Sequence, residues 1–249
     1  MRKVLCALAG ALAGIWPAGA ADHRNLDARV PIAVEDAYPV KFRELTLQAL
    51  FPYRRLRGGG NEGGVVADLE YGLARDVQVN IGTEAFGRTR GRNEGSGDLG
   101  LGVLYNFNTE TLRAPAFALK AEAELPSGVD SRGADLALTG ILTRSHGHNR
   151  FHLKVGHTWL TSAEPDERRR RWQGVAGWDR PVGLQSLLIV GVVAGESEGR
   201  GNPAASRVEV GLRRQMTPRL VASVGAGFGL SGGPDRQPFF LGVALSRSF

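Results

Sequence analysis

The end of the chain forms an alternating segment. From Phe239 to Phe249 every second side chain is bulky and apolar until Arg247, and the chain stops on an aromatic residue. The last residues of soluble proteins usually fray, so a β-forming segment that runs to the final position needs a partner. A closed antiparallel sheet provides one, because its last strand pairs with its first. This end therefore predicts a β-barrel, with Arg247 at a membrane interface where its long side chain reaches water.

The opposite end predicts export. Arg2 and Lys3 precede an apolar run over residues 4–16, and Ala18-Gly19-Ala20 follows as a small-residue cleavage site. This order is typical of a secretory signal peptide, which we assign to residues 1–20. The apolar run is too short for a transmembrane helix. The single cysteine, Cys6, lies within it, so we expect a mature chain without disulfides, thiolate metal sites or cysteine nucleophiles.

Along the rest of the chain, segments of about ten residues alternate apolar with small or polar side chains, which suits tilted membrane strands. In residues 98–107, Leu99, Leu101 and Val103 lie opposite Asp98 and Gly100. A strand gathers such polar groups on one face, whereas a helix would scatter them. We expect twelve strands, at residues 42–51, 65–73, 77–86, 98–107, 115–125, 135–145, 150–160, 171–180, 184–195, 206–215, 219–230 and 238–249.

The connections between these strands alternate in length. Short ones are expected at residues 74–76, 108–114, 146–149, 181–183 and 216–218, and longer ones at 52–63, 88–97, 126–134, 161–170, 196–205 and 231–237. In outer-membrane barrels short turns face the periplasm and long loops face outward. The sequence thus predicts an all-β protein, a transmembrane antiparallel β-barrel over residues 42–249 of the bacterial outer membrane, with both ends in the periplasm.

Two regions fit this pattern less well. Residues 21–41 are too long for a simple lead-in, and they either lie in the lumen as a plug or hang in the periplasm. The strand at 184–195 is weak because Leu187-Leu188-Ile189-Val190 is apolar on both faces.

Aromatic residues provide an independent check, because membrane barrels carry aromatic girdles at both interfaces. The alternation places one group near periplasmic strand ends: Tyr71, Tyr105, Phe107, Phe117, Phe151, Trp178 and Phe249. It places another near outer ends: Trp159, Trp172, Phe228 and Phe239.

The inward face carries charges of both signs. The lumen-lining candidates are Asp68, Glu70, Asp98, Lys120, Glu122, Glu124, His152, Lys154, Arg207, Glu209 and Arg213. Charges on a lumen face must be paired or hydrated. They therefore form either a salt-bridge network that fills a narrow barrel or the wall of a water-filled path.

The sequence gives little support for a nucleic-acid interface, a metal site or a catalytic site. The formal net charge of +6 is modest, and an aromatic-interleaved basic face for nucleic acid is lacking. The arginines gather in expected loops at 88–92 and 168–171, as solvated charge or as contacts to lipopolysaccharide phosphates. His146-Gly147-His148 lacks a neighbouring carboxylate, and we expect no metal, no cofactor and no catalytic residue.

Several short motifs together resemble a known family. They are Pro31-Ile32-Ala33-Val34-Glu35-Asp36-Ala37, Leu69-Glu70-Tyr71-Gly72-Leu73, Gly97-Asp98-Leu99-Gly100-Leu101-Gly102, Ala121-Glu122-Ala123-Glu124-Leu125-Pro126-Ser127-Gly128 and the terminal Phe249. In order and spacing the chain is similar, from Pro31 to Phe249, to the transporter family of the MetA pathway of phenol degradation. The resemblance implies an outer-membrane β-barrel that passes small, often aromatic or hydrophobic, compounds.

The sequence thus favours a passive, porin-like channel for uptake of small organic molecules, aromatic or hydrophobic ones included, and not an enzyme. Its expected partners are outer-membrane lipids and lipopolysaccharide, the barrel-assembly machinery and a small-molecule permeant. Two alternatives stay open. One is a structural or surface-interaction barrel with a closed lumen. The other is a lipid-active enzyme, which would need a serine and a histidine such as His157 together on the outer wall.

Export gives the first testable prediction. N-terminal sequencing of the protein from membrane fractions should begin near Ala21, because the charged start, the apolar run and the small-residue site occur in the order that signal peptidase requires. Mature protein that still carries Met1, or that is found in the cytosol, would contradict the assignment.

Overall fold

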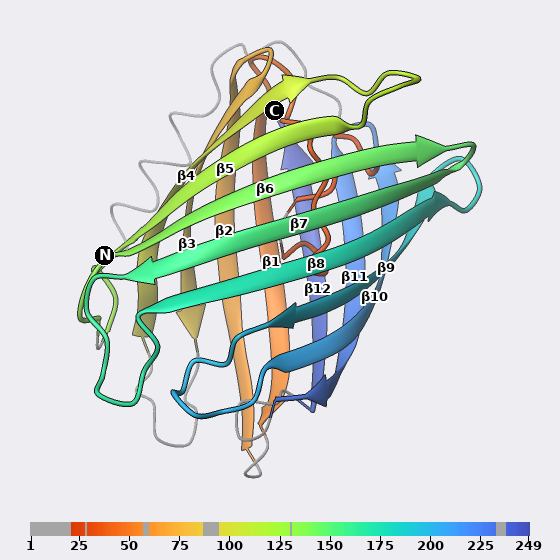
Figure 1. The fold of residues 1–249 in the computed structure, drawn as a ribbon. Helices are drawn as coiled ribbons and strands as arrows, with labels where there is room; N and C mark the ends of the chain where they lie inside the picture. The colour runs from red at the N-terminus through yellow and green to blue at the C-terminus, as the bar shows by residue number, and fades with distance from the viewer. Residues whose placement is uncertain (1–20, 28, 57–59, 87–94, 130, 233–237) are drawn as a thin grey trace.

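The computed structural model describes residues 21–27, 29–56, 60–86, 95–129, 131–232 and 238–249. Within them, twelve antiparallel strands form a closed barrel in which each strand pairs with its sequence neighbours and β1 pairs with β12 (Figure 1). This confirms the predicted fold class. The strands are β1 (Leu45–Leu56), β2 (Gly60–Ala74), β3 (Val77–Phe86), β4 (Gly95–Asn108), β5 (Ala116–Leu125), β6 (Asp135–His146), β7 (Asn149–Leu160), β8 (Arg170–Pro181), β9 (Ser186–Gly195), β10 (Ala205–Thr217), β11 (Leu220–Ser231) and β12 (Phe239–Ser248).

The described residues contain no helix long and apolar enough to cross a membrane. The predicted signal peptide, residues 1–20, lies outside the described residues.

Strand β12 closes the barrel. Its register with β1 runs from Thr46 opposite Ser248 to Arg55 opposite Phe239. The backbone N–H of Phe249 also donates to the carbonyl of Leu45 at 2.9 Å. The final residue is therefore tied to the start of the first strand. The side chain of Arg247 lies over the Phe249 ring, with its guanidinium carbon 5.1 Å from the ring centroid.

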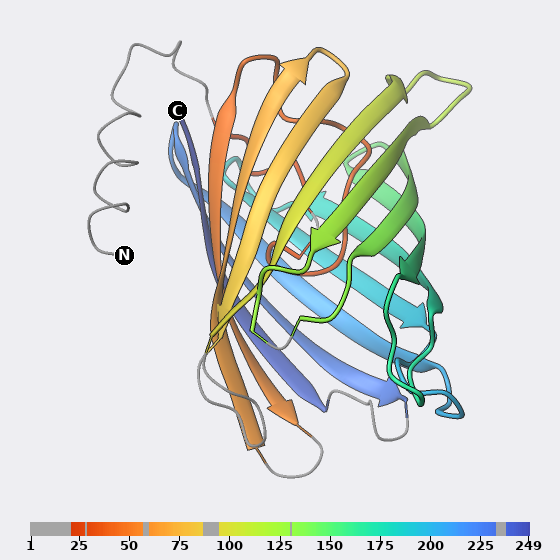
Figure 2. The ribbon, with the colours of Figure 1, turned by 90° about the vertical axis from the view of Figure 1, so that its left-hand side faces the viewer.

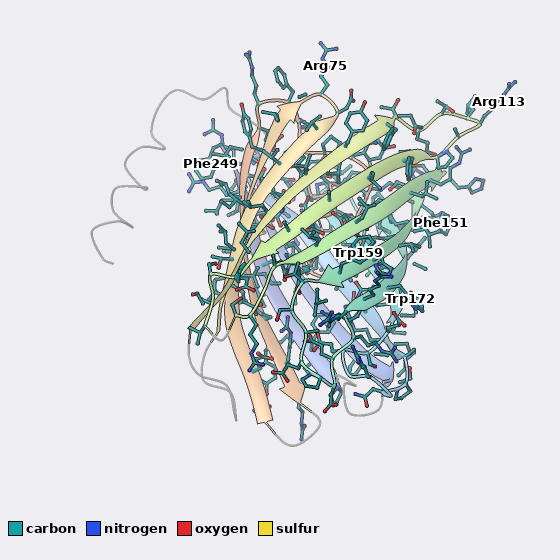
Figure 3. The ribbon with its side chains drawn as sticks, turned by 60° about the vertical axis from the view of Figure 1, so that its left-hand side comes forward. Arg75, Arg113, Phe151, Trp159, Trp172 and Phe249 are labelled. Atoms are coloured by element: carbon teal, nitrogen blue, oxygen red, sulfur yellow. The ribbon has the colours of Figure 1, made fainter. Side chains whose placement is uncertain are left out.

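The outer face is apolar and rich in aromatic residues. In β4 the side chains of Val103, Tyr105 and Phe107 are exposed while Leu104 and Asn106 are buried, which is the expected alternation. The Phe107 ring stacks on Phe117 with centroids 5.1 Å apart. Further along the wall, Phe151, Trp159 and Trp172 lie on the outside of the barrel (Figure 3). These rings are where interfacial girdles require them.

The first hairpin corrects the sequence prediction. We expected a strand at 42–51, a loop at 52–63 and a strand from 65, but β1 continues to Leu56 and β2 begins at Gly60. Pro52 lacks an N–H, and it sits where the pairing of β1 with β2 is interrupted, between the pairs Leu50–Val66 and Tyr53–Gly63, with the register the same on both sides. Proline, arginines and glycines suggested a loop, but pairing with both β2 and β12 keeps this stretch extended.

The N-terminal segment (residues 21–41), whose position the sequence left open, lies inside the barrel. Figure 2 shows it, in red and orange, wound within the wall. Its apolar residues are buried, and Leu26, Ile32 and Val34 are at most 2 % exposed. Its backbone N–H groups donate to inner-wall side chains, as from Ala37 to Thr143 Oγ1 at 3.0 Å and from Val40 to Gln78 Oε1 at 2.8 Å.

A set of inward glycines makes room for this segment. A Cβ built on each of four of them would approach the side chain of Pro31, Ile32 or Val34 to 2.4–2.9 Å: Gly177, Gly191, Gly211 and Gly225. These glycines come from the four adjacent strands β8 to β11. Real Cβ atoms do not approach other atoms so closely. We call this part of the inner wall the glycine seat.

Strand β9 is apolar on both faces because its inward face also packs against the N-terminal segment. The inward side chains of Leu187 and Ile189 are buried in one apolar cluster with Leu26, Ile32 and Val34 of the N-terminal segment. The outward side chain of Val192 is exposed. This strand therefore meets an apolar environment on both sides, and the pattern that weakened its prediction reflects a covered lumen.

The glycine seat can be tested by a matched pair of substitutions. Gly225→Ala would place a Cβ 2.7 Å from Ile32 Cγ2 and 2.8 Å from the Pro31 carbonyl oxygen, whereas the nearest atom to a Cβ at Gly100 is 3.6 Å away. Overpacking of this kind costs about 1–3 kcal/mol. We expect Gly225→Ala to lower the urea midpoint in detergent and expose the N-terminal segment to protease, while Gly100→Ala has no effect. Equal behaviour of the two variants would contradict the seat.

Candidate functional site in the barrel lumen

The centre of the lumen holds a carboxylate between two lysines. Glu35 of the N-terminal segment accepts hydrogen bonds from Lys120 Nζ of β5 and Lys154 Nζ of β7, each at 3.0 Å. Lys120 also lies 3.2 Å from Glu122. Burial opposes the charged form of Glu35, but attraction to Lys120 and Lys154 outweighs it and lowers the pKa of the Glu35 carboxyl to about 2. Glu35 is therefore an anion at any physiological pH.

A second network binds the next residue. Asp36 lies 3.3 Å from Arg150 NH1 and accepts a hydrogen bond from the backbone of Leu26 at 3.1 Å. Arg150 in turn reaches Asp179 of β8 at 2.9 Å. His152 completes the group, with Nε2 2.7 Å from Asp179 Oδ2 and Nδ1 3.1 Å from Thr143 Oγ1. The network ties the segment to β6, β7 and β8.

A third network lies against β1, β2 and β10. The Gln48 side-chain amide donates to Asp27 Oδ2 at 2.6 Å and to Glu70 Oε2 at 2.8 Å. Arg213 donates to the Val30 carbonyl at 3.1 Å and lies 3.7 Å from Asp27. Burial raises the pKa of Asp27 to about 6, although the neighbouring Arg213 acts to lower it.

A cavity of about 740 Å³ occupies the end of the lumen beside the longer connections, and we call it the outer cavity after the predicted orientation. Its wall is strongly acidic, because it carries two arginines, Arg29 and Arg132, against ten carboxylate side chains: Asp68, Glu84, Asp98, Glu122, Glu124, Asp135, Glu164, Asp166, Glu167 and Glu198. Some of these are paired, as Glu164 is with Arg132 at 2.8 Å. The excess of acids contrasts with the positive net charge of the whole chain.

A smaller cavity of about 360 Å³, which we call the periplasmic cavity after the predicted orientation, lies at the opposite end. It separates the N-terminal segment from β1 and β12, and Thr46, Glu44, Ser246 and Ser248 are among the residues that line it. The lumen therefore contains a cavity at each end, and the N-terminal segment and its partners fill the space between them.

The predicted lumen residues divide between these features. Asp68, Asp98, Glu122 and Glu124 line the outer cavity. The others contact the N-terminal segment or its ligands: Glu70 through Gln48, Lys120 and Lys154 through Glu35, His152 through Asp179, Glu209 through the backbone of Ala33 at 2.7 Å, and Arg213 through Val30. Arg207 donates to Glu209 at 2.6 Å.

Sequence reasoning missed the partners of these residues. Asp27, Glu35 and Asp36 belong to a segment without strand periodicity, so nothing indicated where their side chains point. Gln48 and Asp179 occupy inward positions of their strands and could have been found by extending the alternation.

The other groups named from the sequence have their own partners. Arg168 and Arg171 pair with Glu196 and Glu198 at 3.7 and 2.7 Å, while residues 88–92 lie outside the described residues. The ring of His157 contacts Trp159, with centroids 4.4 Å apart. Within the part of the chain that the structure describes, no three His, Cys, Asp or Glu side chains gather as metal ligands would.

Comparison with known proteins identifies the fold. No family model matches the sequence, and no curated protein matches it. The structure resembles an outer-membrane channel from Pseudomonas putida F1, with a TM-score of 0.65, 13% identity and coverage of 86% of this chain and 98% of that one. It also resembles the KdgM porin in complex with disordered oligogalacturonate, with a TM-score of 0.55, 11% identity and coverage of 82% and 99%.

A third similar structure, the β domain of the Bordetella autotransporter BrkA, has a TM-score of 0.50 at 11% identity and covers 82% of this chain and 98% of that one. A channel, a porin and an autotransporter domain thus share this architecture. At such identities the likeness shows the outer-membrane barrel fold alone. The resemblance to the MetA-pathway transporters stays a prediction.

The ion pairs of Glu35 give the next test. Glu35→Gln would leave Lys154, whose side chain is 14% exposed, without this counter-charge. Breaking a buried pair on one side costs about 3–5 kcal/mol. We expect the free energy of unfolding, measured with urea in detergent, to fall by about 3–5 kcal/mol. Adding Lys154→Met to the same variant should recover much of the loss, since Lys120 keeps Glu122. An unchanged midpoint for Glu35→Gln would contradict the role of Glu35.

Proposed function

We propose that the protein is a passive outer-membrane channel that admits small organic molecules through its acidic outer cavity. The observation that supports this most is the cavity itself, which is about 740 Å³ in volume and lined by carboxylates. That volume lies within the range of pockets for small organic ligands. The likeness to an outer-membrane channel and a porin is consistent with the proposal.

The charge of the cavity wall narrows the class of permeant. A ring of acidic side chains at a pore mouth raises the local concentration of cations and lowers that of anions. We therefore infer that cationic and neutral molecules enter more readily than anionic ones. Aromatic or hydrophobic compounds, which the family resemblance suggests, belong to this class when they carry no negative charge.

The proposal includes the location. Apolar strands with aromatic girdles suit a bilayer, and the expected signal peptide would deliver the chain to the periplasm for insertion into the outer membrane. Short turns such as that between β2 and β3 would then face the periplasm, and the acidic cavity would face outward.

A structural barrel with a closed lumen is the second candidate. The buried ion pairs of Glu35 and Asp36 and the glycine seat favour it, because they fix the N-terminal segment across the lumen. The two candidates differ in whether solutes pass that segment.

Ion selectivity distinguishes them. In planar bilayers the wild-type protein should conduct, and its reversal potential in a KCl gradient should favour K⁺. Glu124→Lys, and then Glu84→Lys in addition, should each lower the K⁺/Cl⁻ permeability ratio on the order of twofold, because both side chains line the cavity. Asp76→Lys makes the same charge change in the β2–β3 turn and should leave the ratio unaltered. Folded wild-type protein that passes neither ion would favour the closed barrel.

A further inference from the structure

On the neighbouring strands β1 and β2, residues that line the two cavities lie within two positions of each other. On β2, Asp68 lines the outer cavity. On β1, Thr46 lines the periplasmic cavity. The strand register pairs Asp68 with Gln48 and Thr46 with Glu70. Gln48 and Glu70 are therefore the inward side chains that stand between the two cavities on these strands.

The N-terminal segment completes this barrier. Asp27 lines the periplasmic cavity, and Arg29, two residues later, lines the outer one. The Gln48 amide joins Asp27 to Glu70 by hydrogen bonds of 2.6 and 2.8 Å, and Gln48 is only 2 % exposed. One neutral side chain thus bridges the segment and the wall. Without it, two carboxylates would face each other across the gap.

Buried polar atoms without a protein partner lie on both sides of this barrier. Ser246 Oγ and Arg213 Nε, which belong to residues lining the periplasmic cavity, are buried and have no hydrogen-bond partner among the described residues. The same holds for Asp68 Oδ1 and Asn80 Oδ1 beside the outer cavity. Buried polar groups that lack a protein partner are generally hydrated. Two of these residues flank Gln48 directly, since Ser246 of β12 and Asp68 of β2 are its register partners on the two neighbouring strands.

Elsewhere, packed side chains and ion pairs fill the space between the N-terminal segment and the wall. Against β8 to β11 it packs into the glycine seat. Against β4 to β6, Ala37 is buried in an apolar cluster with Leu104, Ala118 and Ile141. Glu35 is bound by lysines of β5 and β7. Opening a path there would require ion pairs and a larger packed core to separate. At β1 and β2 the two hydrogen bonds of Gln48 and the small apolar cluster of Val30 with Leu50 and Ala244 intervene.

We propose that Gln48 is the constriction residue of the lumen, and that the permeation path runs between the N-terminal segment and strands β1 and β2. Movement of the Gln48 amide joins the two cavities, and the acidic side chains of Asp27 and Glu70 beside it disfavour anions at the narrow point. This inference rests on the proposed channel function and adds to it the position of the path and the residue that sets its size limit.

The test compares two glutamines in the full-length mature chain. Gln48→Ala removes the bridge. Gln78→Ala is the matched control, because Gln78 is also buried, also bonds to the N-terminal segment through Val40, and itself lines neither cavity. In KCl, Gln48→Ala should raise the single-channel conductance by roughly threefold or more, with K⁺ preferred. Gln78→Ala should conduct like the wild type. A detergent gel of unheated samples verifies that each variant is folded.

A second variant keeps the proposal falsifiable if alanine prevents folding. The mature chain is expected to lack cysteine, so Gln48→Cys introduces a single thiol. A cationic methanethiosulfonate reagent added to either chamber should reduce the current through this variant and leave the wild type unaffected.

The outcomes separate the two proposals. Conducting wild type with equal conductance in Gln48→Ala and Gln78→Ala, or a current through Gln48→Cys that the reagent does not change, would overturn the assignment of Gln48 and leave the channel intact. Failure of the wild type and of every folded variant to conduct would overturn the channel function itself.

Discussion

The contact on which the lumen depends is that of Glu35 with Lys120 and Lys154. A closed barrel turns half of its side chains inward, and in its periplasmic half these charges are cut off from bulk water. Glu35 binds two lysines that belong to strands on either side of β6, and Glu122 provides a second counter-charge for Lys120. The position of the whole N-terminal segment follows, because fixing Glu35 there brings Asp36 to Arg150 and places Val34 over the glycine seat. The barrel wall and the N-terminal segment thus depend on each other, because the buried charges of each are paired with side chains of the other.

The strands could be predicted from the sequence because their cause is local. Alternation along ten residues decides which face meets lipid, and neighbouring strands pair in sequence order, so no distant contact had to be known. The exception supports this explanation. At Pro52 the local signals favoured a loop, and the chain stays extended because β12, which lies far away in the sequence, pairs with it on one side. Strand boundaries set by such distant pairing are not encoded in the local pattern.

Only the part of the candidate site that lies on the strands could be predicted. The inward charges Lys120, Lys154 and Glu209 follow from alternation, but their partners lie in a segment 85 to 176 residues away that has no periodicity of its own. Two signals of that segment were nevertheless present. Strand β9 is apolar on its inward face at Leu187 and Ile189, which a water-filled lumen would not favour, and inward glycines recur on consecutive strands. Both features indicate an occupied lumen.

The glycine seat also determines what the barrel would be without its occupant. A wall of glycines has no side chains with which to narrow the space, so the bore on the side of β8 to β11 is defined by Pro31, Ile32 and Val34 rather than by the strands. On this side of the lumen, the strands of the wall and the residues that fill the space inside it are therefore separate stretches of sequence. In the proposed channel, substitutions within about twenty residues would change the free space beside β8 to β11 while every strand pairing stays as it is.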